Sequence, residues 1–292
     1  MPPIPADDDP ERDAQFAATI DYLKGGGPDY GKWHEFAAYF RGTNLLEIGA
    51  GTGHFLAAAR DAGFSVTGIE PDRHRREYVR QRWNIETSAG LLEENALPAA
   101  SFDNVVSFNC LEHIADPTAH AGAVERVLKP GGRFLVSTCN ADCLVERIAG
   151  RYWSMIKEVT HFSIPAPESL RALGRRAGLV AVKLWCSERP LETPSGIALA
   201  VRDWLADLRH SAPPGRGASA AAGGRYASGT GSPGGPLAGM PLRRRALWRL
   251  IQARQFEWLA GLTSRFMLAG SLKALYEKPE RAALHKSFLS ED

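Results

Sequence analysis

The chain has 292 residues, of which 44% are hydrophobic, so it can bury one large core or two small ones. Its 35 basic and 33 acidic residues leave a formal net charge of +2, which gives no electrostatic reason to expect nucleic-acid binding. No apolar run reaches the length of a membrane-spanning helix, and residues 1–10 lack the basic and apolar regions of a signal peptide, so a cytoplasmic protein is predicted. The four cysteines form no CxxC pair; they are interpreted as reduced thiols, and no metal ligands are predicted.

Two helices are expected before the first strand. Residues 14–24 and 30–40 have helical patterns, and the sequence Gly-Gly-Gly-Pro at 25–28 separates them. Region 1–41 is therefore interpreted as a leader followed by N-terminal helices.

A glycine-rich turn follows the first predicted strand. An apolar run at 45–48 leads into three closely spaced glycines, and a helical pattern resumes over 55–62. Glycine permits positive φ and lets the backbone approach a ligand, while the next helix points its N-terminus at the same place. The dinucleotide fingerprint G-x-G-x-x-G would need a glycine where the chain has His54, so the spacing disfavours NAD. The turn predicts a nucleotide-type cofactor site.

An acidic residue stands at the end of the next predicted strand. Residues 65–69 form this strand, and Glu70 follows it about 20 residues beyond the glycines. Such a carboxylate can accept hydrogen bonds from both ribose hydroxyls. The alternative is an ordinary solvated loop acid.

The middle of the chain alternates strands and helices. Strands are predicted within 85–98, at 101–108 and at 128–138, and Asp116 with Pro117 should begin the helix between the last two. This alternation predicts a parallel sheet with helices on both faces, and ligands bind such sheets at the carboxyl ends of the strands.

Together these segments resemble the class I S-adenosylmethionine-dependent methyltransferases, whose first motif is an acidic residue followed by G-x-G-x-G. The resemblance implies an α/β fold, with a Rossmann-like seven-stranded methyltransferase sheet, and S-adenosyl-L-methionine as cofactor. It implies the following cofactor-binding residues: Glu47, Gly49, Ala50, Gly51, Gly53, Glu70, Pro71, Asn109 and Cys110. The residue that meets the adenine stays open among Glu93, Glu94 and Asn95.

A histidine on the acceptor side is the candidate catalytic residue. His161 precedes a helix predicted to begin at Pro165, and a strand is predicted at 179–186. This pattern resembles the ubiquinone-type O-methyltransferases, in which a histidine before a serine-capped helix faces the substrate. The resemblance makes His161 the candidate base, and a neutral imidazole can accept a proton near pH 7. The alternative is that His161 only caps the helix. His113 is expected to fix its loop, with a catalytic role as its alternative.

The predicted domain limits follow from a displaced last strand at 271–279. Residues 42–186 plus 268–280 are expected to form the methyltransferase core, and 281–292 a tail. Residues 187–267 form a helical insertion before the last strand, and 211–240 within it are rich in Gly, Ala, Ser and Pro, which predicts a flexible segment. The basic amphipathic stretch 241–267 is interpreted as a cap over the active site, with peripheral contact to the inner membrane surface or an oligomer contact as alternatives.

The predicted function is transfer of a methyl group to a small-molecule acceptor, with oxygen as the preferred acceptor atom. A lipid-like or glycan-linked acceptor stays open, and no nucleic-acid partner is expected. The alternatives are N- or C-methylation by the same fold, a cofactor-binding scaffold without catalysis, and a nicotinamide dehydrogenase.

Overall fold

The computed structural model describes residues 29–187, 192–210, 265 and 269–280. The predicted helix at 14–24, the flexible segment 211–240 and the tail 281–292 lie outside the described residues. The amphipathic stretch 241–267 also lies outside them, apart from Arg265.

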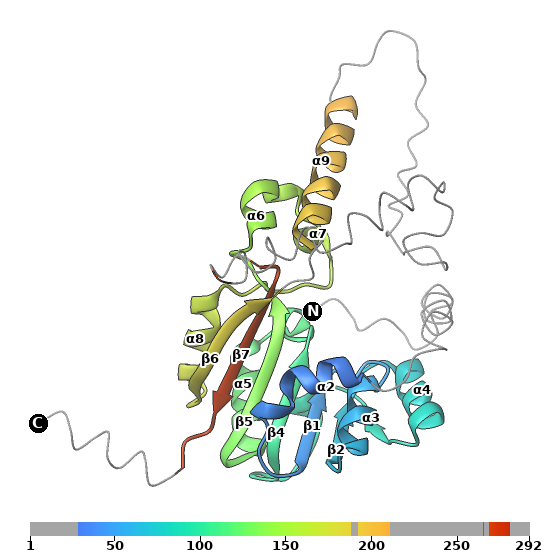
Figure 1. Ribbon diagram of the computed structural model, residues 1–292, viewed down its shortest axis with the longest axis vertical. Coiled ribbons are helices and arrows are strands. Elements are labelled where there is room, and N and C mark those ends of the chain that lie inside the picture. The colour runs from blue at the N-terminus through green and yellow to red at the C-terminus, as the bar shows by residue number, and fades with distance from the viewer. Residues whose placement is uncertain (1–28, 188–191, 211–264, 266–268, 281–292) are drawn as a thin grey trace, which may run out of the picture.

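A seven-stranded sheet with the strand order β3-β2-β1-β4-β5-β7-β6 forms the centre of the fold (Figure 1). Adjacent strands among β1 to β5 are parallel to one another, and β7 runs antiparallel between β5 and β6. This is the α/β sheet that the sequence predicts. The strands are β1 Asn44–Ile48, β2 Ser65–Ile69, β3 Thr87–Ser88, β4 Phe102–Phe108, β5 Leu128–Cys139, β6 Val180–Ser187 and β7 Ser271–Glu277.

Helices pack on both faces of the sheet. Side chains alternate across a strand, so Leu45 lies in the core with α2, α3 and α4, whereas Leu46 lies in the core with α5 and α8. The α-helices are α2 Tyr30–Phe36, α3 His54–Asp61, α4 Arg73–Trp83, α5 Pro117–Val127, α6 Leu144–Ala149, α7 Ser154–Lys157, α8 Pro167–Arg176 and α9 Glu192–His210. The 3-10 turns are η1 Ala37–Tyr39, η2 Leu92–Glu94, η3 Leu111–His113 and η4 Gly150–Tyr152.

Helix α5 begins as predicted from the sequence, whereas α8 begins two residues later. Asp116 caps α5 as predicted, because its carboxylate accepts hydrogen bonds from the backbone N–H groups of Thr118 and Ala119. Helix α8 differs from the prediction in that it begins at Pro167 rather than Pro165. Its N-cap residue is Ala166, which has no side chain able to cap, so the expected serine cap is wrong.

The two strands beside the long insertion meet at one point of the sheet. Ser187 at the end of β6 pairs with Ser271 at the start of β7, and Ser271 also pairs with Cys139 at the end of β5. The chain between β6 and β7 therefore leaves and re-enters the sheet at the carboxyl end of β5. Figure 1 shows α6, α7 and α9 gathered beyond this end of the sheet, where Val145, Trp153 and Ala200 share a small buried cluster.

Tyr276 on β7 makes a hydrogen bond inside the core. Its ring is 1% exposed, and its hydroxyl donates to the carbonyl oxygen of Leu170 on α8 at 2.7 Å. We expect Tyr276→Phe to lower the free energy of unfolding by about 1–2 kcal/mol, because it leaves a buried carbonyl without its donor. Urea unfolding measures the change. The matched control is Tyr30→Phe, whose hydroxyl bonds Asp61 at the surface and whose loss should change the unfolding midpoint little; equal midpoints for the two variants would contradict the assignment.

Candidate active site

The glycine turn after β1 is tied to the end of β2. The backbone N–H groups of Gly49 and Ala50 both donate to the carbonyl oxygen of Ile69, at 2.8 and 3.0 Å. Gly53 stands at the N-cap of α3 with a φ of 70°, in the left-handed region that favours glycine. The turn thus places the N-terminus of α3 beside the carboxyl ends of the first two strands.

The three glycines of the turn have different surroundings. A Cβ on Gly49 would lie 3.0 Å from Sγ of Cys110, and a Cβ on Gly53 would lie 2.9 Å from a methyl group of Val79. A Cβ on Gly51 would meet nothing within 4 Å, although its φ of +57° is also left-handed. Gly49 and Gly53 are therefore required by protein packing, whereas the backbone of Gly51 borders open space.

Glu70 is buried beneath this turn, with 3% of its surface exposed, so the alternative of a solvated loop acid is wrong. One carboxylate oxygen accepts from the backbone N–H of Gly51 at 2.7 Å, and the other accepts from that of Asp72 at 3.0 Å. Burial raises the pKa of Glu70, although Arg75 at 4.0 Å and the two N–H donors act against this rise. Pro71 follows it in an exposed position.

Glu47 lies within β1 and is 4% exposed. The backbone N–H in the first turn of α3, that of Leu56, favours its ionised form, but the Oε2 atom has no hydrogen-bond partner among the described residues. Burial raises the pKa of Glu47 to about 8, and Lys32 only partly opposes this effect. A buried carboxyl oxygen without a donor is costly unless it is protonated or a ligand approaches it.

The chain leaves β4 through Asn109, whose φ of 50° is unusual for a residue other than glycine. Its backbone N–H donates to the carbonyl oxygen of Ser137 on β5 at 2.7 Å. The next residue, Cys110, is pressed against Gly49, and burial raises the pKa of its thiol to about 12. Cys110 is thus a neutral packing group that joins the ends of β1 and β4.

Each of the three candidates for the adenine contact has a partner within the protein. Glu93 contacts Nδ1 of His120 at 2.8 Å, and Glu94 accepts from the backbone N–H of Leu91 at 2.8 Å. The side-chain amide of Asn95 donates to the carbonyl oxygens of Ala89 and Leu91. These contacts do not separate the three candidates, so the adenine contact stays a prediction.

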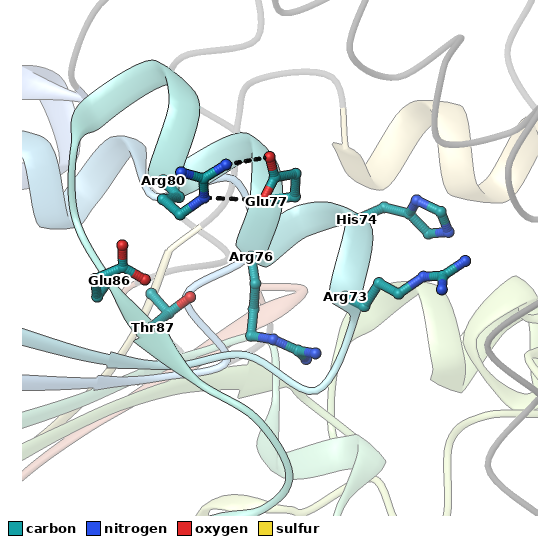
Figure 2. A pocket seen from close by; sticks show the side chains of 7 residues that line it. All are labelled: Arg73, His74, Arg76, Glu77, Arg80, Glu86 and Thr87. Carbon is teal, nitrogen blue, oxygen red and sulfur yellow. Dashed lines mark hydrogen bonds and ion pairs between the residues drawn. The ribbon is translucent and has the colours of Figure 1, made fainter.

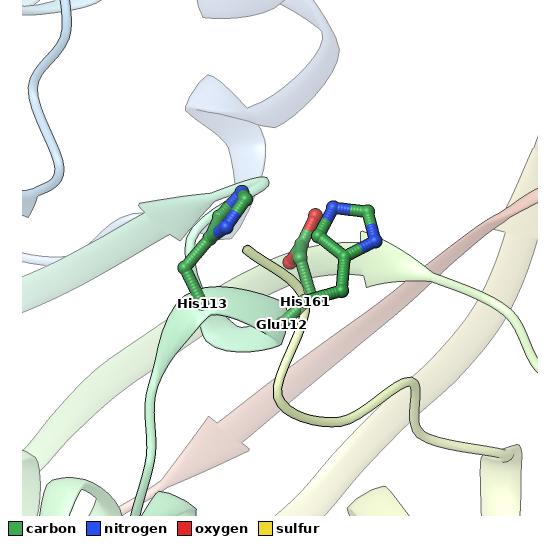
Figure 3. A group of neighbouring side chains, drawn as sticks. All are labelled: Glu112, His113 and His161. Carbon is green, nitrogen blue, oxygen red and sulfur yellow. The ribbon is translucent and has the colours of Figure 1, made fainter. Parts of the chain in front are cut away.

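His161 lies beside two residues that follow β4. The rings of His113 and His161 are 4.8 Å apart and meet edge to face, and Glu112 lies with them in one group (Figure 3). The imidazole Nδ1 of His161 forms a hydrogen bond with the carbonyl oxygen of Met155 at 2.9 Å. Met155 belongs to α7, which precedes His161, and not to α8, which follows it. His161 therefore does not cap α8. Glu112 was not predicted from the sequence as a site residue. The Glu-His pair that follows the end of β4 is the sequence feature that could have indicated it.

A cavity of about 330 Å³ is lined by three residues that contact this group: Thr138 and Cys139 contact Glu112, and Met155 contacts His161. Asn109 and Thr138 border it from the sheet, and Met155 and Leu199 border it from α7 and α9. The remaining lining residues are Cys139, Cys143, Val145, Trp153, Ser154, Gly196, Gly270 and Ser271. The cavity thus lies at the carboxyl end of β5, where the insertion leaves and re-enters the sheet.

A second hollow, of about 510 Å³, lies on α4 at the edge of the sheet (Figure 2). Its lining is charged, and the guanidinium of Arg80 is paired with Glu77 within it. Thr87 of the edge strand β3 completes one side. This hollow lies at the β2–β3 side of the sheet, because Thr87 pairs with Gly68, whereas His113 follows β4.

The sequence matches the methyltransferase domain family over residues 23–184, which is more than half of the chain. The chain belongs to this family. Like the known S-adenosylmethionine-dependent methyltransferases, it carries the acidic residue, the glycine turn and the second acid at the ends of β1 and β2. Because the chain belongs to a methyltransferase family, the alternative of a nicotinamide dehydrogenase is not retained.

Several named methyltransferases are similar to this family member. A ubiquinone biosynthesis O-methyltransferase of Cereibacter sphaeroides is 32% identical over 48% of this chain and 61% of its own length. That of Pseudomonas aeruginosa is 32% identical over 50% of this chain and 68% of its own length. The chain thus covers less than two thirds of the first of these two relatives.

Solved structures share the fold at low sequence identity. A methyltransferase from Archaeoglobus fulgidus matches with a TM-score of 0.53 at 16% identity, over 85% of this chain and 92% of that one. The phosphoethanolamine N-methyltransferase 2 of Haemonchus contortus, solved with S-adenosyl-L-methionine, matches with a TM-score of 0.55 at 15% identity, over 90% of this chain and 56% of that one. These likenesses support the predicted methyltransferase fold.

The residues at the carboxyl ends of β1 and β2 suit S-adenosylmethionine, the cofactor of the family. Gly51 offers an open cradle that a Cβ would fill, and Glu70 holds a fixed carboxylate beside it. Glu47 adds a buried oxygen without a donor, whose ionised form a positively charged ligand would favour. The contacts of Glu47, Glu70, Asn109 and the glycines with the cofactor remain predictions from family resemblance.

The glycine turn yields a test that separates binding from folding. Gly51→Ala should weaken binding of S-adenosylmethionine at least tenfold, since its methyl group would enter the cradle, while the left-handed φ costs only about 1 kcal/mol of stability. Gly53→Ala should lose more stability, because its methyl group would also press on Val79 and Trp83. Calorimetric titration and urea unfolding measure the two quantities. The same loss of stability in both variants would contradict the division of roles.

The buried carboxyl of Glu47 predicts a pH dependence. The pKa of Glu47 is near 8 in the folded chain and near 4.5 ordinarily, so the folded state holds a proton that the unfolded state releases between these values. The free energy of unfolding of the cofactor-free protein should therefore fall as pH rises through this window. Compared with the wild type, Glu47→Gln should become more stable by about 2–4 kcal/mol between pH 5 and pH 8. Thermal and urea unfolding across this range measure the difference, and a pH-independent difference would sink the prediction.

Proposed function

We propose that this methyltransferase transfers a methyl group from S-adenosylmethionine to an oxygen atom of a small-molecule acceptor. The observation that carries the proposal is the cavity of about 330 Å³ that is bordered by Asn109 at the end of β4 and by Met155, whose carbonyl oxygen contacts His161. Similarity to relatives named as O-methyltransferases supports oxygen over nitrogen or carbon.

The chain's main task is to position two reactants. S-adenosylmethionine supplies a methyl group made electrophilic by a positively charged sulfur. Gly51 and Glu70 would hold the cofactor at the ends of β1 and β2, while the cavity beyond Asn109 would hold the acceptor. Correct placement of two reactants can remove roughly 7–11 kcal/mol of barrier.

His161 is the proposed proton acceptor for a hydroxyl in this cavity. A carbonyl oxygen only accepts hydrogen bonds, so the contact with Met155 requires the hydrogen of His161 to sit on Nδ1. In the neutral imidazole, Nε2 then carries a free lone pair. Abstraction of the hydroxyl proton by Nε2 leaves an oxygen nucleophile for methyl transfer.

The lining of the cavity favours a largely apolar acceptor. Val145, Trp153, Met155 and Leu199 present hydrocarbon or thioether surface, so an aromatic or lipid-like molecule with one hydroxyl would fit it best. Among the described residues, no helix combines the length and hydropathy needed to span a bilayer. The membrane contact predicted for residues 241–267 and the cytoplasmic location remain proposals.

The base assignment is tested by His161→Ala. We expect turnover with a hydroxyl acceptor to fall by roughly 10²–10⁴-fold, because a positioned proton acceptor contributes about that much. The dissociation constant for S-adenosylmethionine should stay within twofold, since His161 contacts none of the predicted cofactor residues in the described part of the chain. Radiolabelled methyl transfer to a panel of phenols, alcohols and amines measures the first quantity, and calorimetry measures the second.

The exposed His34 provides a control for this test, because His34→Ala removes an imidazole on α2. Unchanged turnover in His161→Ala would remove the base assignment. Methylation of amines alone would instead show that the acceptor atom is nitrogen. Tight cofactor binding without methyl transfer to any acceptor would favour a non-catalytic scaffold.

A further inference from the structure

We propose that Glu112, His113 and His161 together bind one divalent first-row transition-metal ion, which in turn binds the acceptor hydroxyl. The catalytic half of this inference rests on the proposed function, whereas metal binding itself does not. It revises the expectation from the sequence that the chain has no metal ligands. Figure 3 shows the three side chains converging from η3 and from the loop before α8.

The first support is distance. One potential ligand atom from each of the three side chains lies within 4.8 Å of the other two. Ligand atoms at about 2.1 Å from a tetrahedral ion are roughly 3.4 Å apart, so metal binding requires the three groups to close by roughly 1–1.5 Å at most. Rotation of partly exposed imidazole rings can supply a movement of this size without a change of backbone.

The second support is that the backbone already joins the two segments that carry the ligands. The N–H groups of Phe162 and Ser163 both donate to the carbonyl oxygen of Glu112, at 2.8 and 3.3 Å. In the opposite direction, Nδ1 of His113 bonds the carbonyl oxygen of Thr160 at 3.1 Å. These hydrogen bonds hold His161 beside η3, so ordering the site on binding costs little conformational entropy.

The third support is the protonation state that the carbonyl contacts impose. Nδ1 of His113 bonds Thr160, and Nδ1 of His161 bonds Met155, each through a backbone oxygen that can only accept. Both rings therefore carry hydrogen on Nδ1 and, when neutral, offer Nε2 as a ligand. Donation of the second ring N–H to a carbonyl is the usual way in which proteins orient metal-binding histidines.

The fourth support is the environment of Glu112. Its side chain is 2% exposed, Oε2 accepts from the hydroxyl of Thr138 at 2.8 Å, and Oε1 is 3.6 Å from the thiol sulfur of Cys139. Within the described ranges, no lysine or arginine forms an ion pair with it. A buried acid is normally paired or bound to a metal, and a metal ion would supply the missing positive charge.

The donor set indicates the class of ion. Two imidazoles and one carboxylate are the ligands of catalytic zinc sites and of non-haem iron sites, whereas magnesium and calcium prefer oxygen ligands alone. Three protein ligands leave at least one coordination position open. Thr138 and Cys139, which contact Glu112, also border the cavity, so the open position lies beside the proposed acceptor.

An ion here would activate the acceptor directly. Coordination lowers the pKa of a bound hydroxyl, as it lowers that of water from 15.7 to about 7 on zinc. The hydroxyl O–H bond breaks, its proton passes to solvent, and the oxygen keeps the electron pair that it shares with the ion. Nε2 of His161 then serves as a ligand of the ion and does not itself accept the proton, so with metal bound the ion replaces His161 as the group that activates the hydroxyl.

The test uses Co²⁺ as a spectroscopic probe of the full chain. The protein is dialysed against a chelator, checked for residual metal, and titrated with Co²⁺ while visible absorption is recorded. We expect one Co²⁺ per chain with the spectrum of a nitrogen and oxygen ligand set. His113→Ala and His161→Ala should each weaken the binding at least tenfold, and Glu112→Gln should do so with a similar side-chain volume.

Two control variants are titrated with Co²⁺ in the same way. His34→Ala removes an exposed imidazole outside the cluster and should leave the titration unchanged. Cys139→Ser keeps a hydrogen-bond donor for Glu112 and should also bind Co²⁺ normally; loss of binding would mean that a thiolate is a ligand, which overturns the proposed set. Unchanged Co²⁺ binding in all three cluster variants, with intact folding by circular dichroism, also overturns the proposal.

A second arm distinguishes failure of this inference from failure of the proposed function. Methyl transfer by the chelated protein should fall at least tenfold and recover with Zn²⁺, Mn²⁺ or Co²⁺ but not with Mg²⁺, while S-adenosylmethionine binding stays constant. Full turnover without metal would overturn the catalytic half and leave the methyltransferase function standing. Specific Co²⁺ binding without any methyl transfer would support the metal site and count against the proposed function.

Discussion

The hydrogen bond from the backbone N–H of Gly51 to the carboxylate of Glu70 is the contact on which the cofactor half of the site depends. It joins the turn after β1 to the end of β2, and the two N–H donors from Gly49 and Ala50 to Ile69 reinforce it. Because the second oxygen of Glu70 is fixed by Asp72, the carboxylate cannot rotate away from the turn. A flexible glycine loop is thereby given one shape before any ligand arrives, which reduces the entropy lost on binding.

The sequence predicted the strands and the glycine turn at this end of the sheet because their signals are local. Glycine spacing, an acid at a strand end, and the alternation of strands and helices each act over short stretches, and a parallel sheet then brings distant strand ends together. The strands at 45–48, 65–69 and 101–108 appear close to their expected limits. The predicted start of α8 at Pro165 is wrong because Pro167 disfavours a helical conformation for the residue before it, and Ala166 is extended with a ψ of 167°.

The acceptor half was harder to predict because it depends on contacts between distant parts of the chain. His161 could be named from its neighbours, but its proximity to Glu112 and His113 follows from hydrogen bonds between segments almost fifty residues apart. The cavity likewise combines residues of β5, α7 and α9 with Ser271 of β7. No short sequence motif indicates which distant segments will meet around the cavity. Sequence periodicity therefore predicts the sheet but not the residues that line the cavity.

The pairing of Ser187 with Ser271 gives the protein a modular construction. About eighty residues separate these two positions, yet the strands on either side pair antiparallel along their length, with one register shift between Ala181 and Lys183. Closing so long a connection costs only roughly 2–3 kcal/mol more than closing a short hairpin, because the entropy cost grows with the logarithm of length. During evolution, that connection can therefore be lengthened, replaced or exchanged with little effect on the sheet. Since this connection also supplies part of the cavity wall, its replacement can change substrate preference while the residues at the cofactor end stay the same.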